Sequence, residues 1–125
     1  MLFRSAIPLT VSAPFHCALM KPAEVRLTPE LRAVPSRDPR VPVVANVDAE
    51  PKRTAAASID ALIQQIASPV RWEGVVQRLA SEGVTRYVEV GPGKALSGMI
   101  KRIASGATIQ NVEGPDDLAA IEAQS

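Results

Sequence analysis

Cysteine and aromatic residues are scarce in this sequence. One cysteine, Cys17, stands among 125 residues, so an intramolecular disulfide is excluded and a reducing compartment such as the cytoplasm fits. Aromatic residues make up 3% of the chain, which leaves valine, isoleucine, leucine and alanine to build the core. With a single histidine beside that cysteine, a zinc site is not expected.

The chain also lacks a strong charge of one sign and a long hydrophobic run. A net charge of +1 argues against a nucleic-acid-binding protein, which normally carries a large basic excess. No apolar run approaches the ~20 residues needed to cross a bilayer, so we expect no membrane contact. The first residues, Met1 to Ser5, do not resemble a signal peptide.

Helical periodicity is what the sequence has in abundance. From Ala18 onward the apolar positions favour a helix, although Pro29 should kink it or break it in two. Three further sets of apolar residues recur at the spacing i, i+3, i+4, i+7 and predict three amphipathic helices. These sets are Ile59, Leu62, Ile63 and Ile66; Trp72, Val75, Val76 and Leu79; and Leu96, Met99, Ile100 and Ile103. Ser68 and Pro69 predict the start of the second helix, and Gly83 its end.

Short valine- and isoleucine-rich segments alternate with these helices. Extended chain is expected over residues 7–14, a buried strand over 41–47, and two more strands over 87–90 and 107–112. Loops are expected over 36–40 and 48–54, and a last helix after Gly114. Alternating strands and helices predict an α/β fold with a largely parallel sheet. Three strands are few for such a sheet, so the chain should form one side of a larger one.

Four segments resemble, in order and spacing, the malonyl-CoA:acyl-carrier-protein transacylases of bacterial fatty-acid synthesis. The segments are Val11–Pro22, Val41–Val47, Ser68–Trp72 and Glu89–Gly98, and the resemblance covers about Ile7 to Asn111. It implies that residues 1–125 are the C-terminal portion of one acyltransferase domain, with residues 112–125 as a tail helix. The implied fold is a partial parallel sheet, flanked by helices, from an α/β-hydrolase-like acyltransferase core.

The resemblance also implies a reaction. In this family a serine takes malonyl from coenzyme A and passes it to the phosphopantetheine thiol of acyl carrier protein. The expected partners are therefore malonyl-CoA as substrate and acyl carrier protein, in the cytoplasm, with no cofactor. His16 matches the family's general base, because imidazole changes protonation near neutral pH and can take the serine proton. Gln65 matches the residue whose backbone carbonyl orients that base, or else it is a solvated helix residue.

The nucleophile itself is not found in these 125 residues. The family serine sits in a G-x-S-x-G turn, and no such motif is present. The glutamine-containing oxyanion loop and the arginine that grips the malonyl carboxylate match no segment either. The resemblance therefore predicts that the chain alone is inactive, as a truncated transacylase or one half of a split enzyme. A non-catalytic fragment that binds carrier protein is the alternative.

Other residues have a functional and a plain interpretation. Phe15 would narrow the acyl pocket and favour malonyl over branched groups, or it is a core aromatic. Asn46 could face the cleft at the end of its strand, or cap a turn. A basic rim for the acidic carrier protein is expected from Lys21, Arg26, Lys94, Lys101 and Arg102, unless these are ordinary surface charges.

Two further patterns suggest chemistry that the spacing does not support. Cys17 stands next to His16, but side chains adjacent in sequence rarely meet. Gly91, Pro92 and Gly93 precede a lysine, yet the spacing of a phosphate loop is absent and proline removes a backbone donor. A tight turn between strand and helix is the better interpretation. Ser97, just beyond it, is expected on the helix surface.

Overall fold

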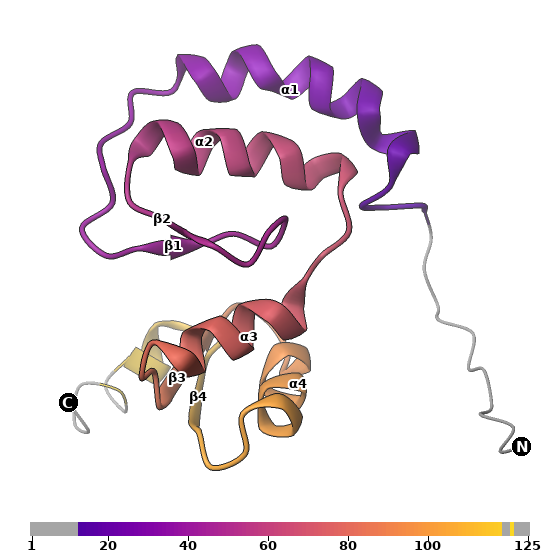
Figure 1. The fold of residues 1–125 in the computed structure, drawn as a ribbon. Helices are drawn as coiled ribbons and strands as arrows, with labels where there is room; N and C mark the ends of the chain where they lie inside the picture. The colour runs from indigo at the N-terminus through magenta and orange to yellow at the C-terminus, as the bar shows by residue number, and fades with distance from the viewer. Residues whose placement is uncertain (1–12, 119–120, 122–125) are drawn as a thin grey trace, which may run out of the picture.

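The computed structural model describes residues 13–118 and 121 of the 125-residue chain, and Figure 1 shows it as two layers of helix and strand. Of the predicted extended segment 7–14, only residues 13 and 14 are described, and of the predicted tail helix 112–125, residues 119–120 and 122–125 lie outside the described part. Within the described tail, Val112 belongs to a strand and Pro115–Asp117 form a 3-10 helix. The first layer contains η1 (Ala18–Met20), α1 (Lys21–Ala33), β1 (Val43–Val44), β2 (Pro51–Lys52), α2 (Ala55–Gln64) and η2 (Gln65–Ala67). The second contains α3 (Trp72–Ser81), β3 (Arg86–Val90), α4 (Ala95–Ile103), β4 (Thr108–Val112) and η3 (Pro115–Asp117).

Helix α1 runs without a break through Pro29 and packs on α2 and η2. The proline lies on the exposed side of α1, and the Thr28 hydroxyl donates to the Glu24 carbonyl at 2.7 Å in the turn before it. Of the two expected outcomes, a break is thus excluded. Packing of the opposite face against α2 supplies the stability that the proline removes.

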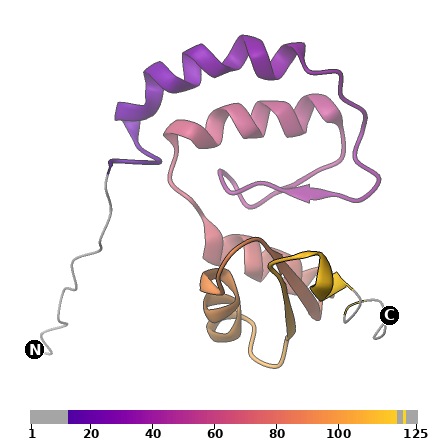
Figure 2. The same cartoon turned by 180° about the vertical axis from the view of Figure 1, so that it is seen from behind.

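The strand predicted over residues 41–47 is wrong in length and burial. Only Val43 and Val44 form β1, and they pair antiparallel with β2, inside the segment predicted as a loop. Val41 is 72% exposed and Val43 46% exposed, whereas only Ala45 is buried. Figure 2 shows this hairpin beneath α2, on the side away from α1. Pro42 has no N–H for a ladder and a turn begins at Asn46, so the strand cannot extend in either direction.

The second layer follows the sequence prediction closely. β3 and β4 pair in parallel from Arg86 opposite Thr108 to Val90 opposite Val112. Val76 of α3, Tyr87 of β3 and Ile100 of α4 meet as the buried core of this layer. These contacts confirm the helical periodicity of both helices and the partial parallel sheet.

Within the part of the chain that the structure describes, one face of the β3–β4 pair is only partly covered. Val88 is 42% exposed and Val90 78% exposed, although alternate residues of the same strand are packed on the helices. Parallel sheets are normally covered on both faces. The exposed valines are therefore what the α/β prediction expects of one side of a larger sheet.

The predicted start of α3 is wrong by several residues. The helix begins at Trp72 with Arg71 as its N-cap, and Ser68 has the extended angles φ −118° and ψ 150°. A residue before proline is disfavoured in the helical region, so Ser68 and Pro69 end the preceding helix instead of opening the next. The far end is as predicted, because Gly83 follows the helix with φ +86°, a conformation that favours glycine.

Candidate active site

His16 occupies a strained turn at the junction between the N-terminal segment and the first helical turn. Its φ of 55° lies in the left-handed region, which is uncommon for any residue except glycine. The Phe15 N–H donates to the Ala13 carbonyl at 3.0 Å, and the Cys17 thiol donates to the Pro14 carbonyl at 3.2 Å. The thiol thus has a backbone partner within the same turn, and His16 is exposed at the tip of that turn.

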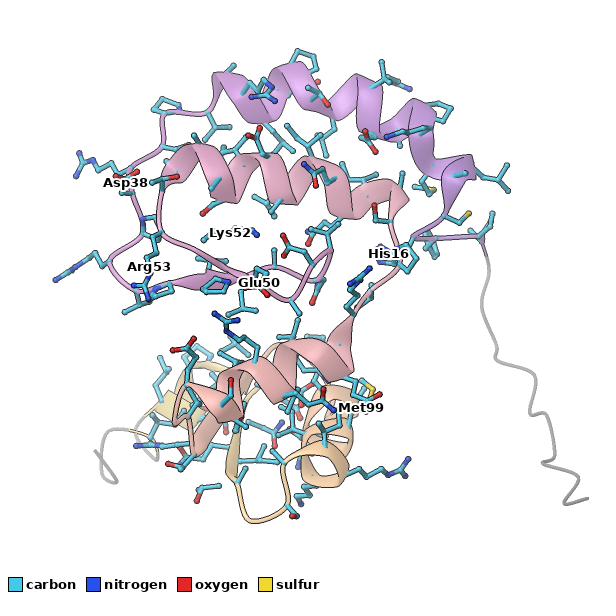
Figure 3. All side chains as sticks on the ribbon, viewed as in Figure 1. His16, Asp38, Glu50, Lys52, Arg53 and Met99 are labelled. Carbon is cyan, nitrogen blue, oxygen red and sulfur yellow. The ribbon has the colours of Figure 1, made fainter. Side chains whose placement is uncertain are left out.

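The imidazole meets the end of another helix. His16 Nδ1 lies 3.0 Å from the backbone carbonyl oxygen of Gln65, a residue 49 positions later. Figure 3 shows His16 beside the segment that connects α2 with α3. A carbonyl oxygen only accepts, so this contact requires the proton on Nδ1 and leaves the Nε2 lone pair free in the neutral ring. The geometry is that of a base held through one nitrogen and open at the other.

Gln65 and Asn46 lie in the wall of the same cavity. Both half-buried residues line a cavity of about 210 Å³ between β1 and α2. The Asn46 carbonyl also accepts the Arg71 N–H at 2.8 Å, which ties the loop after β1 to the start of α3. The remaining cavity wall is mostly apolar: Val43, Val44, Ala45, Lys52, Ser58, Ala61 and Leu62.

Phe15 is exposed in this chain. Its side chain is 58% exposed, directly before the histidine, so it does not pack in the core that the described residues form. Leu19, four residues later in η1, is 72% exposed. An apolar surface thus lies open beside the imidazole in this chain.

The five basic residues do not form one rim. Lys21 and Arg26 belong to α1, and Lys21 forms an ion pair with Glu24 at 2.6 Å. The other three are Lys94, Lys101 and Arg102, which belong to α4 and its N-cap. Figures 1 and 2 show α1 and α4 at opposite ends of the molecule. A single carrier-protein surface would therefore use one group or the other.

A polar cluster that the sequence analysis missed joins β3, α4 and β4. The Glu89 carboxylate accepts the backbone N–H groups of Leu96 and Ser97 at 3.1 and 2.8 Å, and it also accepts the Ser97 hydroxyl. The Asn111 amide donates to both Glu89 and Ser97, at 3.1 and 2.9 Å. Ser97 is only 5% exposed, so its predicted surface position is wrong. An acid at a strand end, one turn before a helix, is the signal that could have indicated this cap.

These hydrogen bonds also keep Glu89 charged beside the Gly-Pro-Gly turn. The Ser97 hydroxyl, with the N–H groups of Ser97 and Leu96 and the Asn111 amide, holds the pKa of Glu89 below its ordinary value, although burial acts in the opposite direction. The N-terminus of α4 is thus already occupied by a carboxylate. This occupancy argues against a phosphate there and supports the prediction of a plain turn between strand and helix.

Over residues 13–118 and 121, no three histidine, cysteine or acidic side chains gather where a metal ion could be held. Within the same residues, no helix has both the length and the hydrophobicity to span a bilayer.

Comparison with known proteins places this geometry in context. No model of a protein family matches the chain. The malonyl CoA-acyl carrier protein transacylase of Salmonella typhimurium is 46% identical over 117 residues, which are 94% of this chain and 38% of that protein. The chain thus spans about two-fifths of the length of the curated relatives it matches.

Solved structures agree with the sequence comparison. The acyl-carrier-protein S-malonyltransferase of Burkholderia pseudomallei superposes with a TM-score of 0.81 at 45% identity, over 93% of this chain and 38% of that one. A malonyl-transacylase solved in complex with a type II PKS acyl-carrier protein gives a TM-score of 0.83 at 38% identity, over 95% and 38% of the two chains.

Proposed function

The chain is homologous to the C-terminal part of the malonyl CoA-acyl carrier protein transacylases, and on that premise we propose that it carries the general base of a malonyl transfer reaction. The observation that carries the proposal is the 3.0 Å contact between His16 Nδ1 and the Gln65 carbonyl. It supports an imidazole that is fixed in one tautomer, with Nε2 available to a nucleophile supplied by a segment outside these 125 residues.

The proposed chemistry follows from that geometry. His16 Nε2 accepts the hydroxyl proton of a serine as its oxygen attacks the thioester carbon of malonyl-CoA. The carbon–sulfur bond breaks, and the coenzyme A thiol leaves with the proton returned by the imidazolium. In the second half, the same nitrogen takes the proton of the carrier-protein thiol as its sulfur attacks the acyl carbon. The bond between that carbon and the serine oxygen then breaks, and the imidazolium returns the proton to the serine oxygen, which restores the free serine and the neutral base. Gln65 holds Nδ1–H throughout and does not itself change protonation.

The strained backbone at His16 also supports a functional role. Holding a non-glycine residue in the left-handed region costs about 1–2 kcal/mol. The surrounding hydrogen bonds of the turn offset that cost and keep the ring beside Gln65. Such strain is concentrated at sites whose geometry serves function.

Phe15 and Asn46 are proposed to contact the substrate. The exposed ring of Phe15 lies directly before the base, where a bulky group leaves little room for an α-methyl branch on the acyl group. In a chimera that joins this chain to the rest of a relative's transacylase, replacing Phe15 by Ala should therefore raise transfer of methylmalonyl relative to transfer of malonyl. An unchanged ratio would remove Phe15 from the acyl pocket.

The test joins this chain to the part of a relative that carries the nucleophilic serine. We would replace the matching 117 residues of the Salmonella typhimurium enzyme by this chain and measure malonyl transfer to acyl carrier protein. Transfer by the chimera and its loss on His16→Ala, by roughly 10²–10⁴-fold, are expected if His16 is the base. Cys17→Ala is the matched control, since its thiol contacts only the Pro14 carbonyl among the bonds described, and it should retain activity.

Assays of the isolated chain distinguish an inactive part of a transacylase from a fragment that binds carrier protein. Without a G-x-S-x-G nucleophile it should not transfer malonyl, and robust transfer by the pure 125-residue chain would contradict the proposal. Retention of acyl carrier protein by this inactive chain would favour the carrier-binding fragment as its role. The two groups of basic residues then give the comparison: charge reversal at Lys21 and Arg26 against charge reversal at Lys101 and Arg102.

A further inference from the structure

The Gln65 carbonyl that holds His16 is available because of the residue four positions later. In a continuous α-helix, the carbonyl of residue 65 accepts the N–H of residue 69. Residue 69 is Pro69, which has no N–H. The sequence itself therefore removes the helical donor for which the Gln65 oxygen would otherwise serve as acceptor.

The nearest backbone donor does not take its place. The Ser68 N–H also donates to the Gln65 oxygen, but its nitrogen lies 3.5 Å away, a long and weak hydrogen bond compared with the 3.0 Å from His16 Nδ1. Ser68 is extended, with φ −118° and ψ 150°, as expected for a residue before proline. Pro69 thus acts twice: it supplies no donor, and it turns the chain out of the helix before another donor can approach.

The imidazole needs this acceptor for a specific reason. A neutral histidine carries its proton on Nδ1 or on Nε2, and only the first form leaves Nε2 able to accept a proton. The Gln65 oxygen favours the first form because it can only accept. A carbonyl oxygen can accept two hydrogen bonds, but a second, short N–H donor weakens the bond to the imidazole and so reduces the preference. His16 is exposed and reaches Gln65 across 49 residues of sequence, so this contact is what orients its ring.

We propose that Pro69 is a positioning residue for the His16 base: having no N–H, it reserves the Gln65 carbonyl for the imidazole and so selects the tautomer with a free Nε2. The effect of Pro69 on catalysis rests on the proposed function, but its effect on the His16 tautomer does not. An experiment can therefore refute either effect without refuting the other.

The tautomer can be read directly, since His16 is the one histidine in the chain. In the full 125-residue chain, ¹⁵N-labelled histidine gives one pair of ring nitrogen signals, and their shifts report which nitrogen carries the proton. Pro69→Ala restores an N–H at position 69 and should shift the ratio of the two tautomers by about five- to tenfold toward Nε2–H, the change expected for one neutral hydrogen bond. Pro92→Ala, in the distant turn before α4, is the control and should leave the ratio unchanged.

A third variant separates the missing donor from the stiffness of the ring. Lactic acid in place of Pro69 introduces an ester, which has neither an N–H nor a pyrrolidine ring. It should keep the Nδ1–H tautomer, as in the parent chain. If it behaves like Pro69→Ala, the missing N–H is not the cause and the proposal is overturned. An unchanged tautomer ratio in folded Pro69→Ala overturns it as well.

Two further measurements keep the test decisive. Should Pro69→Ala fail to fold, Pro69→Gly supplies the same N–H with a smaller helix preference, and the same shift is expected of it. In the Salmonella typhimurium chimera, Pro69→Ala should lower kcat several-fold and leave the KM for malonyl-CoA unchanged. A tautomer shift without any activity in the parent chimera would refute the proposed function and leave the role of Pro69 intact.

Discussion

Replacing Pro29 by Ala is expected to stabilise this chain. Pro29 lies inside α1, where it leaves the carbonyl of Val25 without its i+4 donor. Both residues are on the exposed side of the helix, with Val25 69% exposed, so the substitution removes no buried contact. Only the backbone and the unfolded chain are affected.

The size of the effect follows from two opposing contributions. An interior proline costs a helix about 3 kcal/mol through its missing hydrogen bond and its ring clash. Against this, proline restricts the unfolded chain, and its loss gives back about 0.4–1 kcal/mol of conformational freedom to that state. The free energy of unfolding should therefore rise by about 2 kcal/mol.

Urea unfolding followed by circular dichroism measures this change, and α1 offers its own control. Pro22 lies in the first turn, where a backbone N–H has no helical partner in any case. Pro22→Ala should therefore change the free energy of unfolding by less than about 1 kcal/mol. Equal effects of the two substitutions, or a destabilisation by Pro29→Ala, would refute the reasoning that Pro29 lowers the stability of α1.

Four other substitutions test the second layer and its contact with the loop after β1. The folded pKa of Glu89 is below its ordinary value of 4.5, so its contribution to stability is present above that pH and is lost as the pH falls through the folded pKa. Glu89→Gln should flatten that acid decline of the urea midpoint, and an unchanged slope would contradict the capping role. Val76→Ala, at a fully buried site, should cost about 2 kcal/mol from two lost methyl groups and a small cavity; a loss below about 0.5 kcal/mol would argue against this core. Ala49→Gly should stabilise by about 1 kcal/mol, because Ala49 has φ 60°. Gly74→Ala would place its Cβ 3.2 Å from the Ala49 Cβ, so it should be better tolerated in the Ala49→Gly background, and additivity in a double-mutant cycle would exclude that contact.

The second layer shows how far periodicity alone can reach. The apolar spacing around Val76 and Ile100 and the short run at Tyr87 predict the helices and strands that the structure contains. Each of these elements buries one regular face, so its apolar residues recur at a regular spacing along the sequence. The first layer was harder, because a two-residue hairpin such as β1 and β2 has no period to detect.

The prediction of where α3 starts was wrong for a different physical reason. Ser68 and Pro69 fit the local preferences of a helix start, and they also fit the end of the helix before it. The choice between the two depends on the Arg71 N–H, which is held by the Asn46 carbonyl from a distant loop. Local propensity cannot contain that information.

By itself, the sequence determined the helical faces, the α/β class, the single histidine in its family context and the proline at position 69. Only the tertiary structure decided that the His16 ring meets the Gln65 carbonyl, that Phe15 is exposed and that Glu89 caps α4. The reason is distance along the chain: 49 residues separate the imidazole from its acceptor, and a hydrogen bond acts over 3.0 Å. A pattern read within one helix or strand cannot place two such groups together, whereas packing of α1 on α2 and η2 does.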